Sequence, residues 1–196
     1  MSNLMDYLDW RGDLTFREAP FNEVDNLILA QLVYVEFAGI VPAPGEEGTI
    51  TVKEACELFF AAHDRKEIME RVSMTKTAAF VLEKMAQTER FCNAQLFGYI
   101  NDISKEEQSQ FSVVCVRLDD KSIYVSFSGT DNTIVGWREN FNMGYLSETP
   151  GQLKAVDYLN HMVKEDWKKI RVGGHSKGGN LSVYASVKCD RNIQKR

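Results

Sequence analysis

The chain has 196 residues, enough for one domain with a substantial core and little room for two. Hydrophobic residues make up 44% and charged residues 26%, which excludes a disordered chain. A net charge of −5 with scattered basic residues argues against a nucleic-acid-binding protein. No apolar run is long enough to span a membrane, and the acidic start lacks the pattern of a secretion signal.

The cysteines indicate a reducing compartment. They are well separated along the chain, at Cys56, Cys92, Cys115 and Cys189. This spacing fits neither a zinc site nor a disulfide framework. We therefore expect reduced, buried thiols in a soluble cytoplasmic protein.

The first 95 residues are predicted to form a mainly helical part. Asn22 fits the N-cap position of a dense apolar helix that is expected to end near Gly39. Thr51 followed by Glu54 is a capping-box pattern, which predicts that another helix begins there. The predicted helices of this part cover residues 21–39, 52–64 and 66–92, the last with a break near 73–75.

Residues 96–196 are predicted to form a sheet with its connecting helices. The runs FSVVCVRL and SIYVSFS, joined by DDK, are typical of a β-hairpin, and KIRV is typical of a further strand. Residues 129–151 are expected to be irregular, and helices are predicted over 152–167 and 177–190. Strand, helix, strand, turn and helix then follow one another as in α/β folds. We expect a single α/β domain over residues 1–196, in which the helical part packs on the sheet.

Four glycines surround Ser176 in the segment VGGHSKGGN, between a predicted strand and a predicted helix. This is the G-x-S-x-G pattern of a nucleophile elbow, in which a strained turn requires small residues two positions either side of the serine. Gly174 and Gly178 occupy those positions. A helix N-terminus favours developing negative charge, and the backbone N–H of Lys177 is predicted to point at an oxyanion. Ser176 is therefore the candidate nucleophile.

Two other interpretations of the glycine cluster were weighed. A glycine-rich turn without chemistry shows the same short pattern by chance, although the strand before it and the helix after it favour the elbow. A phosphate-binding loop requires G-x-x-x-x-G-K-[ST], whereas Lys177 here precedes Gly178. The phosphate-loop interpretation is rejected.

The segment FSGTDNTIVGWRENFNM, together with GGHSKGGNLSVYAS, resembles the class 3 lipase branch of the α/β hydrolases. More narrowly, the two segments are similar to an uncharacterised bacterial lipase-like family of unknown function. The resemblance implies an α/β-hydrolase-like sheet in which Thr130 contributes to the oxyanion hole through its N–H and its hydroxyl. It also implies a lid-like segment from Asn132 to Trp137 and a structural role for His175 under the turn.

Two positions depart from the pattern of those lipases. Ser128 stands where they usually have arginine, and Asn140 where they usually have aspartate. We hypothesise that the two positions approach each other, so that an ion pair has been lost from both sides at once. Losing both partners costs less than leaving one charge buried alone. Neutral hydrogen bonds are then expected to position Thr130.

A serine nucleophile needs a base oriented by a carboxylate, in the chain order Ser, Asp or Glu, His for this fold. After Ser176 the chain offers only Asp190, roughly 21 Å away along a helix, and no histidine. His161 falls on the polar face of its predicted helix, and His63 closes another helix. No base is therefore visible in the sequence.

The resemblance implies that the triad aspartate and histidine lie on strands beyond Arg196. We expect a hydrolase sheet that is truncated after the elbow helix, or a remnant that no longer catalyses. A truncated sheet exposes an edge and apolar surface, which would favour self-association.

The remaining residues give weaker indications. Trp137, Phe141 and Tyr145 are interpreted as core packing at least as readily as an acyl-binding pocket. Asp131 is expected to hold its loop through its own backbone bonds. No metal-ligand cluster and no dinucleotide fingerprint is present, so no cofactor is predicted.

The leading functional hypothesis is a serine hydrolase that acts on an ester or other acyl, lipid-like small molecule. Ser176 is the nucleophile, and the Lys177 N–H and Thr130 stabilise the oxyanion. The alternative is a non-catalytic α/β module or inactive fragment that binds an acyl ligand or a partner. An acyltransferase, thioesterase or peptidase activity remains open.

Overall fold

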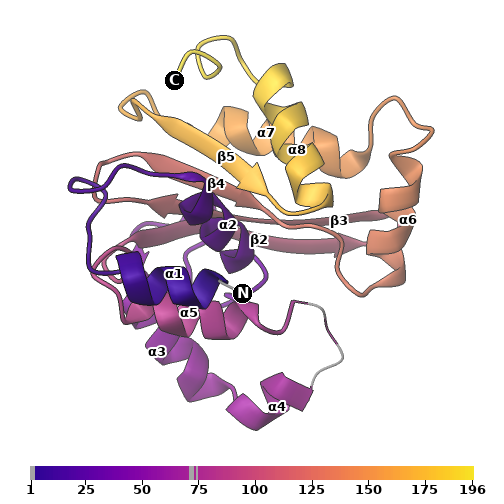
Figure 1. Cartoon of the computed structure of the whole chain (residues 1–196). Coiled ribbons are helices and arrows are strands. Elements are labelled where there is room, and N and C mark those ends of the chain that lie inside the picture. The colour runs from indigo at the N-terminus through magenta and orange to yellow at the C-terminus, as the bar shows by residue number, and fades with distance from the viewer. Residues whose placement is uncertain (1–2, 71–72, 74) are drawn as a thin grey trace.

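The computed structural model describes residues 3–70, 73 and 75–196. At its centre lies a five-stranded mixed sheet with the strand order β1-β2-β3-β4-β5 (Figure 1). Neighbours from β1 to β4 pair antiparallel, whereas β5 pairs parallel with β4. The strands are β1 (Ile50–Thr51), β2 (Gln95–Ser104), β3 (Ser109–Arg117), β4 (Ile123–Phe127) and β5 (Ile170–Gly174).

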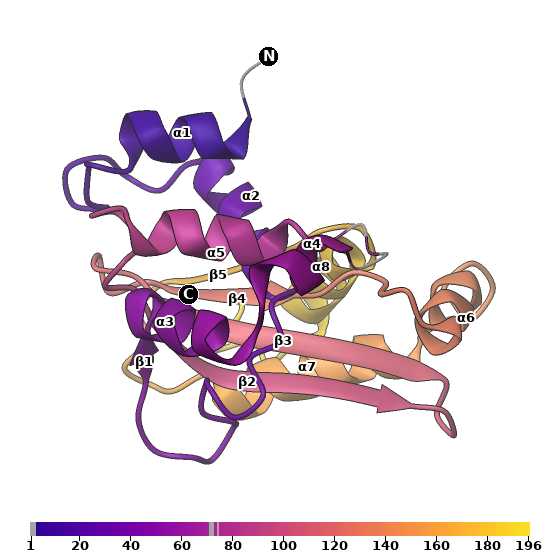
Figure 2. The same cartoon turned by 90° about the horizontal axis from the view of Figure 1, so that it is seen from below.

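Helices cover both faces of this sheet. They are α1 (Leu4–Arg11), α2 (Glu23–Leu32), α3 (Val52–Ala62), α4 (Arg65–Glu70), α5 (Ala78–Ala86), α6 (Ile134–Asn142), α7 (Pro150–Met162) and α8 (Lys177–Lys188). Helices α1, α2, α3 and α5 contribute to the core on one face, and α7 and α8 to the core on the other (Figure 2). The chain is thus an α/β protein, as predicted. None of its described helices is both long and apolar enough to cross a membrane.

Side-chain caps fix where the predicted helices of the first half begin. Asn22 caps α2 and forms a reciprocal capping box with Asp25. Thr51 and Glu54 form the predicted capping box of α3. The third predicted stretch forms α4 and α5 with the expected interruption between them, although residues 71, 72 and 74 of that break lie outside the described residues.

Three helices end earlier than the hydrophobic pattern predicts. Helix α2 ends at Leu32, so its predicted extension to near Gly39 was wrong. Helix α5 ends at Ala86 and not near residue 92, and helix α7 ends at Met162 and not at Trp167. In each case a following apolar residue is buried outside a helix: Phe37, Phe91 and Trp167. Burial in the core continues the apolar pattern where helical structure has stopped.

Alternation along β4 divides its side chains between the two cores. Ile123, Val125 and Phe127 face α7 and α8. Tyr124 faces the helical first half, where its hydroxyl donates to Asn26 Oδ1 at 2.8 Å. The period of two along a strand therefore locks both helical layers onto one sheet.

Strand β2 and helix α6, like α1 and β1, were not predicted. Strand β2 carries a bulge between Phe97 and Ile100, where Gly98 has a φ of +65°. Helix α6 lies within the segment that was expected to be irregular, and the Thr133 side chain caps it by accepting from Gly136 N at 3.0 Å. Gly98 interrupts the alternating pattern of β2, and exposed apolar residues obscure the helical pattern of α6.

Candidate active site

Ser176 lies at the tight turn between β5 and α8, at the C-terminal end of the parallel strand (Figure 1). Its backbone adopts φ +57° and ψ −122°, a conformation that a residue with a side chain rarely adopts. The residue is exposed, and it is the N-cap of α8. Backbone strain at an exposed serine on a helix N-terminus is the geometry that the elbow pattern predicts.

Close backbone packing explains the flanking glycines. A Cβ on Gly174 would lie 2.5 Å from the carbonyl carbon of Gly178. A Cβ on Gly178 would lie 2.8 Å from the carbonyl carbons of Phe127 and Ser128, at the end of β4. Real Cβ atoms do not approach backbone this closely. The glycines thus let the turn pack against the loop that follows β4.

The loop after β4 reaches the elbow at Gly129. A Cβ on Gly129 would lie 3.3 Å from Ser176 Cβ. Thr130 follows directly, and its Oγ1 is buried without a hydrogen-bond partner among the described residues. Asp131 holds the loop, since its Oδ1 accepts from Thr133 N at 2.9 Å and from Thr133 Oγ1 at 2.6 Å. A buried hydroxyl without a partner is rare in folded proteins, and a functional role is one of its known explanations.

Gln110 supplies the neutral contacts of this loop. Its Nε2 donates to Ser128 Oγ at 3.1 Å, and its Oε1 accepts from Asp131 N at 3.4 Å. Ser128 is buried, whereas Asn140 is only half-buried on α6. The Ser128 hydroxyl therefore pairs with Gln110, and among the described residues no hydrogen bond joins Ser128 to Asn140, so their expected approach is not supported.

A buried ion pair lies directly behind the elbow. The Lys177 Nζ lies 2.6 Å from Glu139 Oε2, and both side chains are 0% exposed. Lys177 Nζ also donates to Gln110 O. Glu139 accepts from Gln110 N at 3.1 Å and from Gly151 N at 2.7 Å. Glu139 thus joins α6, β3, the start of α7 and the first residue of α8.

Burial and the neighbouring carboxylate have opposite effects on the pKa of Lys177. Desolvation lowers the pKa of Lys177 from its ordinary value, and the Glu139 carboxylate opposes that shift. The predicted role of Lys177 concerned its backbone N–H, which begins α8. Its side chain has the separate role of anchoring the elbow to Glu139. The segment that resembles a lipase lid runs into α6, which this same contact ties down.

Tyr34 joins the two halves of the site from the other direction. It follows α2, and its hydroxyl accepts from Gly129 N at 2.9 Å. The same hydroxyl lies 3.2 Å from His175 Nδ1. Burial raises the pKa of Tyr34, so its phenol keeps its proton. His175 is exposed and has a structural contact, in keeping with the role that the resemblance implies.

The described residues place no base at Ser176. The Ser176 side chain makes no capping hydrogen bond to α8. His161 Nδ1 lies 2.8 Å from Asp157 O on α7, and His63 Nδ1 lies 2.9 Å from Phe59 O at the end of α3. Both histidines therefore have partners within one turn of their own helices.

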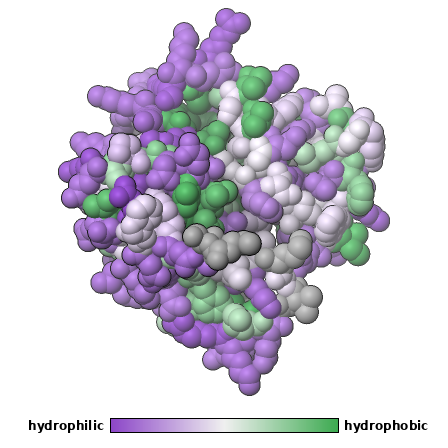
Figure 3. All heavy atoms as spheres, in the orientation of Figure 1, coloured by the Kyte–Doolittle hydropathy of each residue, from purple (hydrophilic) through white to green (hydrophobic). Residues whose placement is uncertain are grey.

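The aromatic residues of α6 and the following turn do not pack in the core. Trp137 is 46% exposed, Phe141 68% and Tyr145 73%, so the core-packing interpretation was wrong. Figure 3 shows hydrophobic side chains at the edge of the molecule where α6 lies in Figure 1. The inward face of α6 is held by Glu139, which leaves this apolar side outward.

Sequence reasoning missed Tyr34, Gln110 and Glu139. Tyr34 stands inside an apolar run whose pattern predicts a helix, and no motif in that run indicates a functional residue. A charged residue such as Glu139 is expected on the surface by default. Only the lysine within the elbow motif hinted that a carboxylate had to lie nearby.

The site offers no metal centre. Within residues 3–70, 73 and 75–196, no three His, Cys, Asp or Glu side chains are grouped so that they could hold a metal ion. The four cysteines are free thiols. The chemistry available at the elbow is that of a hydroxyl, backbone N–H groups and a helix N-terminus.

Comparison with known proteins identifies a family. No curated protein and no solved structure matches the chain significantly. A family model described as Mbeg1-like matches residues 85–196, more than half of the chain. The matched segment contains β2 to β5, the loop at Thr130, the Glu139–Lys177 pair and the elbow. The chain therefore belongs to the Mbeg1-like family.

Proposed function

We propose that this protein is a serine hydrolase of the α/β-hydrolase type, which acts on an ester or other acyl, lipid-like small molecule. Ser176 is its nucleophile, and the Lys177 N–H and Thr130 bind the oxyanion. The four free cysteines suit a reducing, cytoplasmic setting for this activity.

The observation that carries this proposal is the backbone of Ser176, at φ +57° and ψ −122° between a strand and a helix. Strain of this kind costs on the order of 1–3 kcal/mol and is concentrated at functional sites. A turn without chemistry has no need to hold an exposed serine in this conformation. The unpartnered Thr130 Oγ1 beside the elbow adds a donor for an oxyanion.

The reaction begins when Ser176 Oγ bonds to the acyl carbon. The carbonyl π electrons then move to the oxygen, where the Lys177 N–H and Thr130 stabilise the negative charge. The hydroxyl proton passes to a base, and the described residues do not supply one in contact with Ser176. The tetrahedral adduct then collapses: the bond from the acyl carbon to the alcohol oxygen breaks, and the alcohol leaves with the proton that the base had taken. Water then adds to the acyl-serine, the bond to Ser176 Oγ breaks, and the acid leaves while Ser176 regains its hydroxyl proton.

A fluorophosphonate probe tests the nucleophile. Incubation followed by intact mass measurement is expected to show one adduct on the chain. Ser176→Ala is expected to abolish it, because the probe reacts with an activated serine hydroxyl. Ser147→Ala, at an exposed serine outside the elbow, is the matched control and should be labelled at the wild-type rate. An adduct that survives Ser176→Ala contradicts the assignment.

Thr130→Val tests the oxyanion role of the hydroxyl. Valine keeps the shape of threonine and removes the buried Oγ1, which has no partner to lose. We expect Ser176 labelling to slow by about tenfold to a hundredfold, near the lower range for loss of one oxyanion donor. The melting temperature should stay close to that of the wild type. Unchanged labelling kinetics would limit the Thr130 contribution to its backbone N–H.

A second function is favoured by one observation, the lack of a base in contact with Ser176. Under this alternative the protein is a non-catalytic α/β module that binds an acyl ligand in the same place. It predicts no fluorophosphonate adduct, but a saturable, Ser176-independent interaction with a fatty acid. The mass spectrum with and without the probe therefore separates the two functions.

A further inference from the structure

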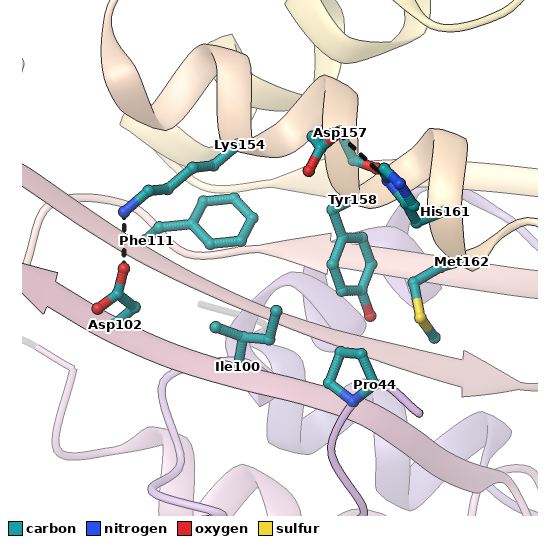
Figure 4. A pocket seen from close by; sticks show the side chains of 9 residues that line it. All are labelled: Pro44, Ile100, Asp102, Phe111, Lys154, Asp157, Tyr158, His161 and Met162. Carbon is teal, nitrogen blue, oxygen red and sulfur yellow. Dashed lines mark hydrogen bonds and ion pairs between the residues drawn. The ribbon is translucent and has the colours of Figure 1, made fainter. Parts of the chain in front are cut away.

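A separate cavity of about 260 Å³ lies between α7 and the middle of β2 (Figure 4). It belongs to the face of the sheet that α7 covers, and its lining includes neither Ser176 nor Thr130. The lining residues are Pro44, Ile100, Asp102, Phe111, Lys154, Asp157, Tyr158, His161 and Met162.

The floor of this cavity is apolar and rigid. Phe111 and Tyr158 are buried, and their ring centroids lie 6.3 Å apart. The Tyr158 hydroxyl donates to Gly98 O at 2.6 Å, on the bulge of β2. Ile100 and Met162 are partly buried against the same core. Because both rings are packed in the core and the Tyr158 hydroxyl is hydrogen-bonded, the apolar floor is formed before any ligand binds.

The rim carries more negative than positive charge. Lys154 Nζ lies 2.7 Å from Asp102 Oδ2 and 2.7 Å from Glu107 Oε2. Asp157, on the other side of the opening, adds a third carboxylate (Figure 4). The lining thus carries two carboxylates and one ammonium, and Glu107, which pairs with Lys154 from outside the lining, brings the local formal charge to −2.

Asp157 keeps an available carboxylate. His161 Nδ1 lies 2.8 Å from the Asp157 carbonyl oxygen and 3.2 Å from Oδ1, both of which are acceptors. A proton on Nδ1 is thus directed chiefly at the carbonyl. The Asp157 side chain is 74% exposed and makes no ion pair with a lysine or arginine among the described residues. A positive group that entered the cavity would have this carboxylate as its partner.

We propose that this cavity binds a small hydrophobic amine, whose ammonium pairs with Asp157 and whose apolar tail lies on Phe111 and Tyr158. An aromatic floor favours such a ligand in two ways. It buries the hydrocarbon tail, and the faces of its rings attract a nearby cation. The negative rim disfavours a carboxylate of the same size. This site is independent of the chemistry proposed for Ser176.

The experiment is a titration of the full chain with 2-phenylethylamine, followed by ¹H–¹⁵N NMR. Chemical-shift changes are expected at α7 and the middle of β2, with a Kd on the order of 1 mM for so small a ligand. The probe 3-phenylpropanoate has the same ring and a tail of similar length with a carboxylate. It is expected to bind about threefold to fivefold more weakly, since an exposed charge contact contributes up to about 1 kcal/mol, a factor of about five in Kd.

Charge reversal sharpens the test. Asp157→Lys is expected to exchange the preference, so that 3-phenylpropanoate binds more tightly than the amine. Asp166→Lys makes the same charge change at an exposed residue outside the lining and should leave the preference unchanged. Because both residues are exposed, both variants should fold, and their NMR spectra report this directly.

Three results would each overturn the proposal. The first is equal binding of the two probes to the wild type, which would show that the rim charge does not select the ligand. The second is an amine preference that survives Asp157→Lys, and the third is a set of shift changes located away from α7 and β2.

Discussion

Glu139→Ala is expected to lower the free energy of unfolding by about 3–5 kcal/mol, because it leaves the buried Lys177 ammonium without its carboxylate. Lys177 Nζ would retain only the Gln110 carbonyl as a partner. The N–H groups of Gln110 and Gly151 would lose their acceptor as well. Unsatisfied buried donors each cost about 1–3 kcal/mol, so the loss is not confined to the charge.

Urea unfolding, followed by circular dichroism, measures this effect. Glu165→Ala is the matched control, since Glu165 is exposed and a surface truncation is expected to change stability by within about 0.5 kcal/mol. Lys177→Met combined with Glu139→Gln removes both charges and keeps an acceptor for a backbone N–H. That double variant should recover part of the loss. Equal midpoints for Glu139→Ala and Glu165→Ala would contradict the structural role of the pair.

The same variants connect stability to the proposed chemistry. Lys177 follows Ser176 directly, so a displaced Lys177 side chain would disturb the backbone N–H that is proposed to bind the oxyanion. Fluorophosphonate labelling of Glu139→Ala, measured well below its unfolding midpoint, is therefore expected to be slower than that of the wild type. The ion pair would then act as a positioning contact as well as a stabilising one.

The elbow could be predicted from the sequence because its physical requirements are local. Small residues two positions either side of Ser176 are needed wherever a strand turns directly into a helix. Gly174 and Gly178 meet that requirement, and the structure gives the packing reason for each. Capping boxes were predictable for the same reason, since Thr51 and Glu54 are three residues apart.

The rest of the site depends on contacts between distant segments. Tyr34 reaches Gly129 across 95 positions of the chain, and Glu139 reaches Lys177 across 38. No local pattern encodes either contact. Helix α6 was missed because its exposed side is apolar, with Ile134 at 74% and Phe141 at 68% exposure. An outward apolar face reverses the pattern by which surface helices are recognised.

A second buried pair fixes the helical first half to the part of the chain that matches the family. The Arg90 and Asp25 side chains are 1% and 0% exposed, and Arg90 Nη2 lies 2.5 Å from Asp25 Oδ2. Arg90 Nη1 also donates to the carbonyls of Leu14 and Ala19 at 2.9 and 3.0 Å. Asp25 belongs to α2, which also packs against β4 and β5. This arginine therefore ties the N-terminal loop and α2 to the segment that leads into β2.

Arg90→Ala is expected to cost about 3–5 kcal/mol of unfolding free energy, since it strands the Asp25 carboxylate in the interior. Arg65→Ala is an unusually close control. Arg65 also forms a bidentate ion pair, with Glu83, whose two hydrogen bonds measure 2.6 and 2.5 Å. The Arg65 side chain, however, is 56% exposed. A surface pair of this kind contributes about 0–1 kcal/mol.

The comparison of these two variants isolates burial as the cause. Arg90→Lys keeps a positive charge but loses the planar fork, so it should fall between Arg90→Ala and the wild type. If urea unfolding gave the same loss of unfolding free energy for Arg90→Ala and Arg65→Ala, burial of the Arg90–Asp25 pair would have no effect on its contribution to stability. A much larger loss of unfolding free energy for Arg90→Ala than for Arg65→Ala would mean that burial makes the Arg90–Asp25 pair important for stability. The pair would then help to fix α2, and with it Tyr34, near the elbow.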